Sequence, residues 1–263
     1  MLRYKENEDL EHRFNEVDDL VERWRRRVAR VAPRLRNEFR DRLLISLIYH
    51  DAALEGDVLT YSEIKTALDP GATLVEGVPS ASHEGIRRYH ASCVFIEQMS
   101  VPDAPPFDKA MLDRLYGILA PEEQATGAQY RTENPLHRLY YHDIVPPERI
   151  ASAMDQLGDW LTSEDARTLH PIERATEAHL RLMTIFPWAK DSGRGARILS
   201  NMILRRAEHP MAVLHSIDRQ GYYEALRGDR ETLITLYLEA IETTALSEIK
   251  VYDEAERASR RAS

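Results

Sequence analysis

The residues of this chain that could do chemistry are concentrated in one short segment near position 190. Lys190, Asp191 and Ser192 precede Arg194 and Arg197, and the segment leads into a helical pattern. Arginine binds carboxylate and phosphate groups through paired N–H donors, and lysine contacts phosphate as a point charge. Asp191 is a candidate for proton transfer, although a carboxylate beside two arginines is expected to stay ionised, which makes it a weak base. Lys190 fits either an anion contact or a solvated position at the edge of a loop.

Other reactive side chains do not form a set in the sequence. The single cysteine, Cys93, stands in an apolar stretch and is expected to pack there rather than act as a nucleophile. His83 with His90, and His137 with His142, lack a spacing that stands out as metal-binding. We therefore predict neither a catalytic cysteine nor a metal site.

Hydrophobic periodicity predicts that helices position the residues near 190. Apolar residues recur at steps of three and four along residues 10–35, where Pro33 is expected to kink or restart the helix. Gly56 is expected to end one helix, and Thr60 or Ser62 to cap the next. Helical patterns also cover residues 43–54, 63–68, 84–99, 150–161, 171–185, 196–206 and 230–245.

One stretch between these helices has a different pattern. Residues 127–147 show alternation in place of a helical period, which predicts a short β-hairpin flap at about residues 135–143. Strand signals elsewhere are too few for a fold based on a sheet. The predicted class is therefore all-α with a small β flap.

Composition limits the partners of the chain. A net charge of −9 and an isoelectric point near 5.6 argue against nonspecific attraction to nucleic acid or to anionic membranes. No stretch approaches the roughly 18 apolar residues of a membrane-spanning helix, and the charged N-terminal segment lacks the apolar region of a secretory signal. We expect a cytoplasmic protein whose partner is an anionic small molecule or another protein. The oligomeric state stays open.

The segment Phe186–Arg197 resembles the signature of the Fic family. That signature is histidine, proline, phenylalanine, any residue, an acid, glycine, asparagine, glycine, arginine, two residues of any kind and arginine. Trp188 replaces one aromatic residue by another, and four positions match outright: Pro187, Gly193, Arg194 and Arg197. The flanking sequence extends the resemblance from about Arg42 to Ala245, and Asp51–Gly56 looks like the inhibitory helix of the family.

The resemblance implies a domain plan and a fold. It predicts a helical extension at residues 1–40, a Fic (Fido-type) helical bundle at residues 41–246 and a polar tail at residues 247–263. A helix ending at Ile185 and another beginning near Ser192 are expected to flank the motif loop.

The same resemblance assigns expected roles within the motif. Phe186 stands where the family has its histidine base, and Lys190 stands where the family has the acid that binds Mg²⁺, so Mg²⁺-nucleotide binding in the usual manner is not expected. Asp191 replaces a glycine and Ser192 an asparagine, in the turn whose N–H groups would bind phosphate together with Gly193. Because aspartate and serine are preferred helix caps, either side chain is expected to compete with a ligand for those N–H groups.

The remaining expected roles concern the arginines and two neighbours. In the family, the arginines at positions 194 and 197 hold the β and γ phosphates. Glu55 matches the inhibitory glutamate, which predicts a Glu55–Arg197 ion pair of either regulatory or purely structural character. His179 matches a family histidine on the helix before the motif, where a satisfied core histidine is a more common role than a catalyst.

Three functions are compatible with these residues. The first is a modified enzyme whose pocket, with Phe186, Trp188 and His179 around it, binds an anionic ligand and uses Asp191 and Lys190 in a non-standard reaction. The second is a catalytically inactive Fic protein that binds a partner or a nucleotide in regulation. The third is residual nucleotidyl or phosphate transfer. Retention of Glu55 and both arginines favours the first, whereas loss of the base and the metal ligand favours the second.

Overall fold

The computed structural model describes residues 2–69, 80–101, 103–120, 130–135, 143–227 and 230–262. These residues form helices joined by turns and loops, and no strand occurs among them. The helices are α1 (Leu2–Val28), α2 (Pro33–Glu55), α3 (Tyr61–Leu68), α4 (Ser80–Gln98), α5 (Lys109–Leu119), α6 (Ile150–Thr162), α7 (Glu164–Thr168), α8 (Pro171–Ile185), α9 (Ser192–Arg206), α10 (Arg219–Ala225) and α11 (Arg230–Ala262). The predicted all-α class is confirmed. The predicted flap lies outside the described residues, except for its two ends at Pro135 and Asp143.

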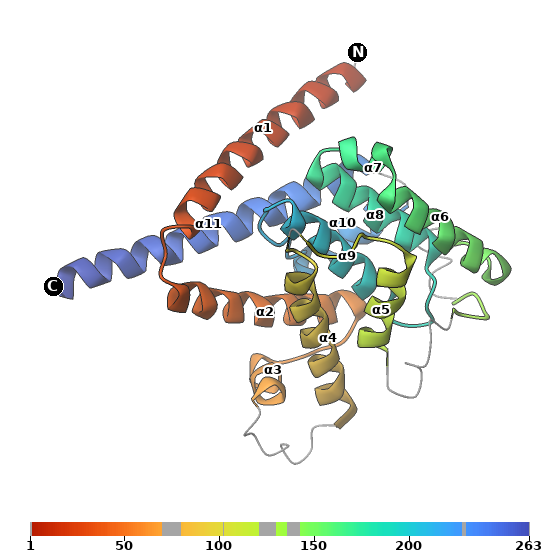
Figure 1. Ribbon diagram of the computed structural model, residues 1–263, viewed down its shortest axis with the longest axis horizontal. Helices are drawn as coiled ribbons and strands as arrows, with labels where there is room; N and C mark the ends of the chain where they lie inside the picture. The colour runs from red at the N-terminus through yellow and green to blue at the C-terminus, as the bar shows by residue number, and fades with distance from the viewer. Residues whose placement is uncertain are drawn as a thin grey trace.

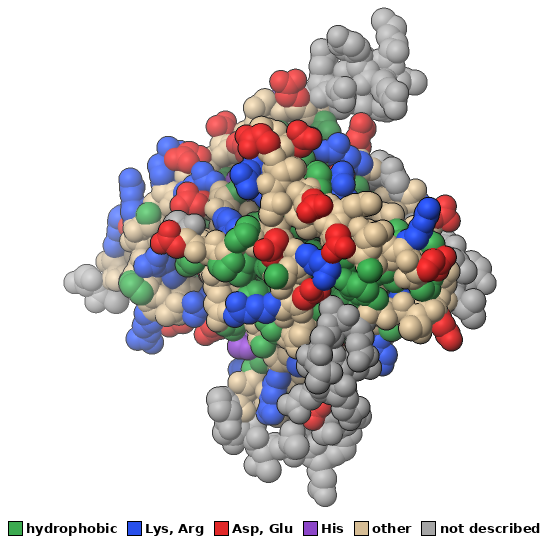
Figure 2. Space-filling view, turned by 45° about the vertical axis from the view of Figure 1, so that its right-hand side comes forward, with side chains coloured by type: hydrophobic (Ala, Val, Ile, Leu, Met, Phe, Trp, Pro, Cys, Tyr) green, Lys and Arg blue, Asp and Glu red, His purple; other side chains and the backbone are tan. Residues whose placement is uncertain are grey.

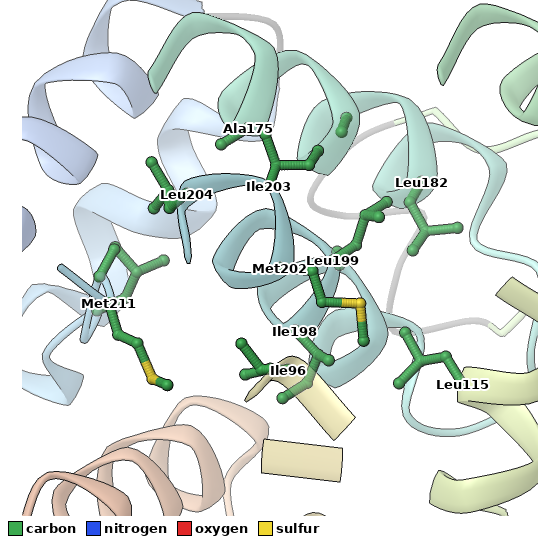
Figure 3. Packing of buried hydrophobic residues seen from close by; sticks show 14 of the residues in the cluster. Ile96, Leu115, Ala175, Leu182, Ile198, Leu199, Met202, Ile203, Leu204 and Met211 are labelled. Carbon is green, nitrogen blue, oxygen red and sulfur yellow. The ribbon is translucent and has the colours of Figure 1, made fainter. Parts of the chain in front are cut away.

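Helices α8 and α9 pack against each other at the centre of the bundle (Figure 1). Helices α4 and α5 pack on α9, while α6 and α11 pack on α8. Leu199 and Met202 of α9 extend into a core that also contains Leu182, Ile96 and Leu115 (Figure 3). Burial of these apolar side chains is the main stabilising contribution to such a bundle. It also fixes the position of the first turn of α9, which carries the motif arginines.

The helices beside the motif begin and end as expected. Pro171 opens α8, where its fixed φ suits the first turn, and the helix ends at Ile185. Phe186 then adopts the left-handed conformation and stops the helical hydrogen-bond ladder. Helix α9 begins at Ser192. Only the six-residue loop from Phe186 to Asp191 therefore separates the two central helices.

The end of α2 is defined by local signals. Gly56 has φ of 97°, a left-handed conformation that glycine adopts without a Cβ clash, and it ends α2 as predicted. Thr60 then caps α3 in a capping box. Its hydroxyl accepts a hydrogen bond from the Glu63 N–H at 3.2 Å, and the Glu63 carboxylate accepts one from the Thr60 N–H at 2.6 Å. Gly56 therefore sets the end of α2, which faces the motif, and the capping box sets the start of α3.

Helices α1 and α11, the first and last helices of the described chain, pack against each other. Arg27 of α1 forms ion pairs of 2.8 Å with Asp253 and Glu256 of α11. Pro33 starts α2 as a separate helix, which agrees with the expected restart, and α2 continues through the expected domain boundary at residue 40.

The segment expected to be a polar tail differs from the prediction. Residues 247–262 continue α11, and Tyr252 is 1% exposed because its ring packs edge-on against Phe39, with 5.9 Å between ring centroids. The polar composition of the segment hid this apolar face.

Helix α5 is an element that the periodicity analysis does not predict. The carboxylate of Asp108 caps it by accepting a hydrogen bond from the Met111 N–H at 2.8 Å. Leu112 and Leu115 of α5 are fully buried and close the core beside α9. An aspartate followed by this short apolar pattern was the available signal.

Charged side chains of both signs are exposed on the surface (Figure 2). On the face drawn in Figure 2, Lys and Arg side chains alternate with Asp and Glu instead of gathering into a basic patch. Within the described part of the chain, no helix combines the length and apolar character needed to cross a bilayer.

Candidate functional site

The first and last residues of the motif loop adopt the left-handed backbone conformation. Phe186 has φ of 45° and Asp191 has φ of 65°, and neither is a glycine. Such conformations cost about 1–2 kcal/mol for residues with a Cβ, less for aspartate than for an aromatic residue. Asp191 occupies the position where the Fic signature has glycine, and its positive φ explains why glycine suits that position.

Arg131 stabilises the strained loop from outside the motif. Its side chain is 5% exposed, and its Nε donates a hydrogen bond to the Phe186 carbonyl at 2.7 Å. The backbone N–H of Arg131 donates to the Pro187 carbonyl at 2.9 Å. The guanidinium also donates to Asn134 Oδ1 at 2.6 Å and to the Val145 carbonyl. Arg131 therefore fastens the motif loop to both segments that lead into the predicted flap.

The two motif arginines are held by carboxylates. Arg197 donates from Nη2 to Glu55 Oε1 at 2.7 Å, so the expected Glu55–Arg197 ion pair is present. Arg194 donates from Nη1 to Asp191 at 2.7 Å and from Nη2 to Asp57 at 3.1 Å. Of the four carboxylates that hold the arginines, three come from α2 and the turn after it: Asp51, Glu55 and Asp57.

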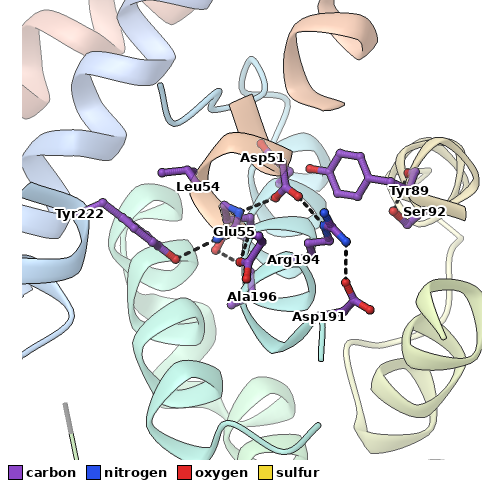
Figure 4. Close-up of polar contacts among 12 residues, drawn as sticks. Asp51, Leu54, Glu55, Tyr89, Ser92, Asp191, Arg194, Ala196 and Tyr222 are labelled. Carbon is purple, nitrogen blue, oxygen red and sulfur yellow. Dashed lines mark hydrogen bonds and ion pairs between the residues drawn. The ribbon is translucent and has the colours of Figure 1, made fainter. Parts of the chain in front are cut away.

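Asp51 is the carboxylate that the two arginines share (Figure 4). Its Oδ2 accepts a hydrogen bond from Arg194 Nε at 2.8 Å, and its Oδ1 accepts one from Arg197 Nε at 2.5 Å. Asp51 is 3% exposed, and Arg197 is 5% exposed. Charges buried to this extent require partners, because their desolvation is otherwise uncompensated.

Burial and ion pairing act in opposite directions on the pKa values of these groups. Burial lowers the pKa of Arg194, but Asp51 and Asp191 outweigh burial and raise it. Arg197 behaves in the same way, with Asp51 as its strongest carboxylate partner. For Asp191 the balance is reversed, because burial raises its pKa more than the Arg194 guanidinium lowers it. Asp191 therefore holds a proton more readily than an ordinary aspartate.

The N-terminus of α9 is not capped by the motif side chains, contrary to expectation. Asp191 makes no capping hydrogen bond, and the Ser192 hydroxyl turns inward, where it bonds the backbone N–H and carbonyl of Trp188 at 3.0 Å. Glu55 occupies the space above this turn instead. A Cβ added to Gly193 would lie 2.3 Å from Glu55 Oε1. Glycine at position 193 therefore permits the close approach of a carboxylate to the start of the helix.

A cavity of about 710 Å³ lies beside this cluster. Five of the residues named in the sequence analysis line it together: Phe186, Lys190, Asp191, Arg194 and Glu55. Its described charged lining consists of five acids and three cations: Asp51, Glu55, Asp57, Glu84, Asp191, Arg88, Lys190 and Arg194. Acids remain in excess even when Arg197, directly behind the lining, is counted.

Two residues expected around the pocket lie in the core. Trp188 is fully buried and stacks on Tyr116 with ring centroids 4.7 Å apart. His179 is fully buried between two tyrosines, with Nδ1 2.8 Å from the Tyr237 hydroxyl and Nε2 3.0 Å from the Tyr222 hydroxyl. The Tyr222 hydroxyl also accepts a hydrogen bond from Arg197 at 3.1 Å. His179 thus supports the arginine through Tyr222 and does not line the cavity.

The residues of the loop do not fit a Mg²⁺ site of the family's kind. Lys190, at the position of the metal-binding acid, is exposed, and an ammonium group cannot ligate a cation. The nearby carboxylate of Asp191 is engaged by Arg194. Among the described residues, the carboxylates around the cavity do not form a group compact enough to hold a metal ion.

Three residues that build the site were not predicted from the sequence to be part of it: Asp51, Arg131 and Tyr222. Asp51 precedes Glu55 by one helical turn, so the two carboxylates lie on the same face of α2. That spacing was a usable signal for Asp51. Arg131 and Tyr222 reach the motif only through the tertiary fold, and their own sequence context gives no comparable signal.

Comparisons with known proteins agree with this architecture. A model of the Fic/DOC family matches residues 106–204. The chain is 30% identical over 188 residues to a protein adenylyltransferase Fic of Nematostella vectensis, covering 68% of this chain and 42% of that protein. It is 27% identical over 203 residues to a protein adenylyltransferase Fic of Drosophila melanogaster, covering 75% of this chain and 40% of that protein. The chain thus spans less than half the length of these relatives.

Solved structures show the same fold. A Fic domain containing signaling protein from Bacteroides thetaiotaomicron superposes with a TM-score of 0.79 at 21% identity, covering 90% of this chain and 98% of that chain. Fic-1 from C. elegans superposes with a TM-score of 0.74 at 22% identity, covering 93% of this chain and 71% of that chain. These proteins share an all-α bundle with this chain. In this chain, α8, the motif loop and α9 with its two arginines lie at the centre of the bundle. The chain belongs to the Fic/DOC family.

Proposed function

We propose that this chain is a divergent Fic protein that does not transfer AMP by the Mg²⁺-dependent route of the family, and that it serves as a regulatory binding protein. The observation that carries the proposal is the occupation of both motif arginines by carboxylates of the chain itself. Asp51 bridges Arg194 and Arg197, while Glu55 and Asp57 hold the outer nitrogens. An incoming phosphate would have to displace these partners to reach either guanidinium.

The chemistry of the loop supports the same conclusion. Phe186 has no titratable group and is 2% exposed, and loss of a positioned general base typically costs about 10²- to 10⁴-fold in rate. Acids outnumber cations in the cavity lining. Their negative charge repels phosphate at short range, so the cavity opposes an anionic ligand. Relatives of this chain are named protein adenylyltransferase Fic. This chain has Phe186 and Lys190 at the positions where the Fic signature has its histidine and its acid.

The proposal is tested by AMP transfer from ATP carrying a radiolabel on its α-phosphate. The intact chain and its Glu55→Gly variant are incubated with the nucleotide and Mg²⁺, with and without a cell extract as the source of target proteins. We expect no labelling above that of boiled protein in either case. Mg²⁺-dependent labelling by the Glu55→Gly variant would overturn the proposal, because it would show that the loop still transfers AMP once one carboxylate is removed.

A second candidate function rests on Asp191. This residue lines the cavity, and burial raises its pKa despite the ion pair with Arg194. A carboxylate with a raised pKa is a better proton acceptor than an ordinary one. Among the cavity cations, Lys190 is exposed. Arg88 has a buried Nε without a hydrogen-bond partner, and its Nη1 lies 3.8 Å from the Glu84 carboxylate. These groups favour a modified enzyme that binds an anion and uses Asp191 in proton transfer.

A ligand screen separates the two candidates. Nucleotides, sugar phosphates and small carboxylates are tested by thermal shift, and calorimetry then compares the best ligand on the parent chain, Glu55→Gly and Arg194→Ala. The modified enzyme predicts tighter binding to Glu55→Gly and no binding to Arg194→Ala. A Glu55→Gly variant that melts much earlier and binds no better supports a structural Glu55–Arg197 pair, and with it the regulatory binding protein.

A further inference from the structure

A second cluster of ligating side chains lies far from the motif cavity. Asp18 belongs to α1, His170 precedes α8, and His209 follows α9. One ligand atom from each of the three residues lies within 4.8 Å of the others. The sequence gives no spacing signal for this cluster, since the fold brings together positions from three separate parts of the chain.

His209 has a ring nitrogen that lacks a partner. The residue is 4% exposed, and its Nδ1 lies 2.9 Å from the Ala207 carbonyl, an acceptor to which only a protonated nitrogen can donate. The neutral ring therefore carries a lone pair on Nε2, and this atom is buried without a hydrogen-bond partner. Metal-binding histidines commonly donate one ring N–H to a backbone carbonyl and ligate through the other nitrogen. The ring of His209 is already in that form.

The end of α9 holds His209 in place. Glu208 adopts φ of 58°, and the His209 N–H donates to the Leu204 carbonyl at 2.9 Å, as in a left-handed helix end. The His209 carbonyl in turn accepts a hydrogen bond from Arg205 at 3.2 Å. The ring therefore has a fixed backbone anchor, which a ligand on a flexible loop would lack.

His170 and Asp18 complete the cluster. The His170 Nε2 lies 3.2 Å from each carboxylate oxygen of Asp18. The His170 Nδ1 faces the Ile172 N–H at 3.3 Å, so in the neutral ring the proton is on Nε2, toward Asp18. For His170 to bind a cation through Nε2, its proton would have to be on Nδ1. The Ile172 N–H would then lose its long contact with Nδ1. The Asp18 side chain is half exposed, which leaves access from solvent.

We propose that Asp18, His170 and His209 bind one divalent transition-metal ion, with Zn²⁺ as the best fit, at the junction of α1, α8 and α9. Tetrahedral Zn²⁺ with bonds of about 2.0–2.1 Å places its ligand atoms about 3.3 Å apart, close to the separation already present between Asp18 and His170. Two imidazoles with one carboxylate suit Zn²⁺, whereas Mg²⁺ and Ca²⁺ prefer sets of oxygen ligands. Solvent water takes the fourth position.

The surroundings of the cluster set limits on the affinity. Arg25 places a positive charge near His209, and this charge opposes metal binding. Its guanidinium is held by the Ala207 and Glu208 carbonyls at 2.7 and 2.8 Å, and Asp18 offsets its charge. Because the three ligands come from α1 and from the ends of both motif-flanking helices, a bound ion would tie α1 to the centre of the bundle.

Zinc titration of the intact, untagged chain tests the site. After chelator treatment, the apparent affinity is measured by competition with a chromogenic zinc chelator, and the melting temperature is measured with ZnCl₂ and, separately, MgCl₂. We expect one saturable Zn²⁺ per chain, a higher melting temperature with Zn²⁺ and no matching effect of Mg²⁺. Co²⁺ in place of Zn²⁺ should give the visible absorption of a tetrahedral site.

Matched variants identify the ligands. Asp18→Asn and His170→Gln, both on accessible side chains, should weaken Zn²⁺ binding at least about tenfold. Asp19→Asn, the same change one residue along on the exposed face of α1, should leave it within about twofold. His209→Gln should abolish binding, and the two accessible variants carry the test if this buried change prevents folding. Absence of saturable binding, or equal affinities of Asp18→Asn and Asp19→Asn, would overturn the proposal.

Discussion

The carboxylate of Asp51 accepts a hydrogen bond from Nε of Arg197 at 2.5 Å, and both side chains are almost completely buried. The second oxygen of Asp51 accepts from Arg194 at 2.8 Å, so one carboxylate of α2 fastens the first turn of α9. The other three carboxylates of the cluster, those of Glu55, Asp57 and Asp191, are more exposed, and each contacts only one of the two arginines. Asp51 is therefore the residue on which the cluster depends.

The first prediction compares two acids that both contact Arg194. Asp51→Asn should lower the free energy of unfolding by about 3–5 kcal/mol, because it leaves buried guanidinium charge without its shared partner. Asp57→Asn should cost less than about 1 kcal/mol, because the Asp57 side chain is 64% exposed and its ion pair is screened by solvent. Urea unfolding of the two variants beside the parent chain provides the comparison. Equal losses of stability would contradict the central role of Asp51.

The features of the site that could be predicted from the sequence are those determined by residues close together in the chain or by a known motif. Pro171, Gly56 and the Thr60 capping box act within one or two turns, so the end of α2 and the starts of α3 and α8 followed from the sequence. The Glu55–Arg197 pair followed from the family resemblance. Each rests on a signal that is complete within a short segment or a known motif.

The features that could not be predicted depend on contacts between distant segments. The orientation of the Ser192 hydroxyl toward Trp188 follows from packing of the loop, and propensity alone favoured a cap. Likewise, Tyr252 is buried because it packs against Phe39 of α2. The composition of the last residues does not indicate this contact. The cluster of Asp18, His170 and His209 has no sequence spacing of any kind.

The second prediction concerns acid stability through His50. Its ring lies 4.2 Å from that of His215, and the His50 Nδ1 accepts a hydrogen bond from the Ser216 N–H at 3.3 Å. Burial, with a smaller contribution from the charge of His215, lowers the pKa of His50 from 6.5 to about 4. The unfolded chain therefore binds a proton in this window that the folded chain does not, and stability falls as the pH falls from about 6.5 to about 4.

The His50→Gln variant tests that origin. It should reduce the slope of unfolding free energy against pH between pH 6.5 and 4, because glutamine does not titrate. His209, whose pKa burial lowers to about 4, and His90, whose pKa burial also lowers, should contribute to the remaining slope. A slope unchanged by the substitution would show that His50 is protonated equally in the folded and unfolded states.

The third prediction uses the close approach of Glu55 to Gly193. A Cβ at position 193 would lie 2.3 Å from Glu55 Oε1 and 3.1 Å from Arg197 Nη1, so Gly193→Ala should displace the carboxylate and lower stability by about 1–3 kcal/mol. In the Glu55→Gly background the same substitution should cost much less, since only the arginine contact remains. The two effects should therefore be non-additive in a double-mutant cycle. Additive losses would place Glu55 away from the start of α9 in solution.

The last prediction asks what prevents the motif from transferring AMP. Phe186→His with Lys190→Asp restores the residue types of the base and the metal-binding acid, but Glu55 and Asp191 continue to hold Arg197 and Arg194. We expect this pair of substitutions alone to give no Mg²⁺-dependent labelling from ATP. Adding Glu55→Gly and Asp191→Gly frees one nitrogen of each arginine, and glycine at 191 relieves about 1 kcal/mol of left-handed backbone strain.

Labelling should therefore appear only in the fourfold variant, while Glu55→Gly with Asp191→Gly alone stays inactive because the loop still lacks a base. The three variants are compared for folding by melting temperature before labelling is measured, so an unfolded variant is not counted as inactive. Labelling by Phe186→His with Lys190→Asp alone would show that the carboxylates are no barrier to nucleotide binding. A folded but inactive fourfold variant would instead leave Asp51 as the remaining obstacle, because its hydrogen bonds at 2.8 and 2.5 Å still hold both arginines.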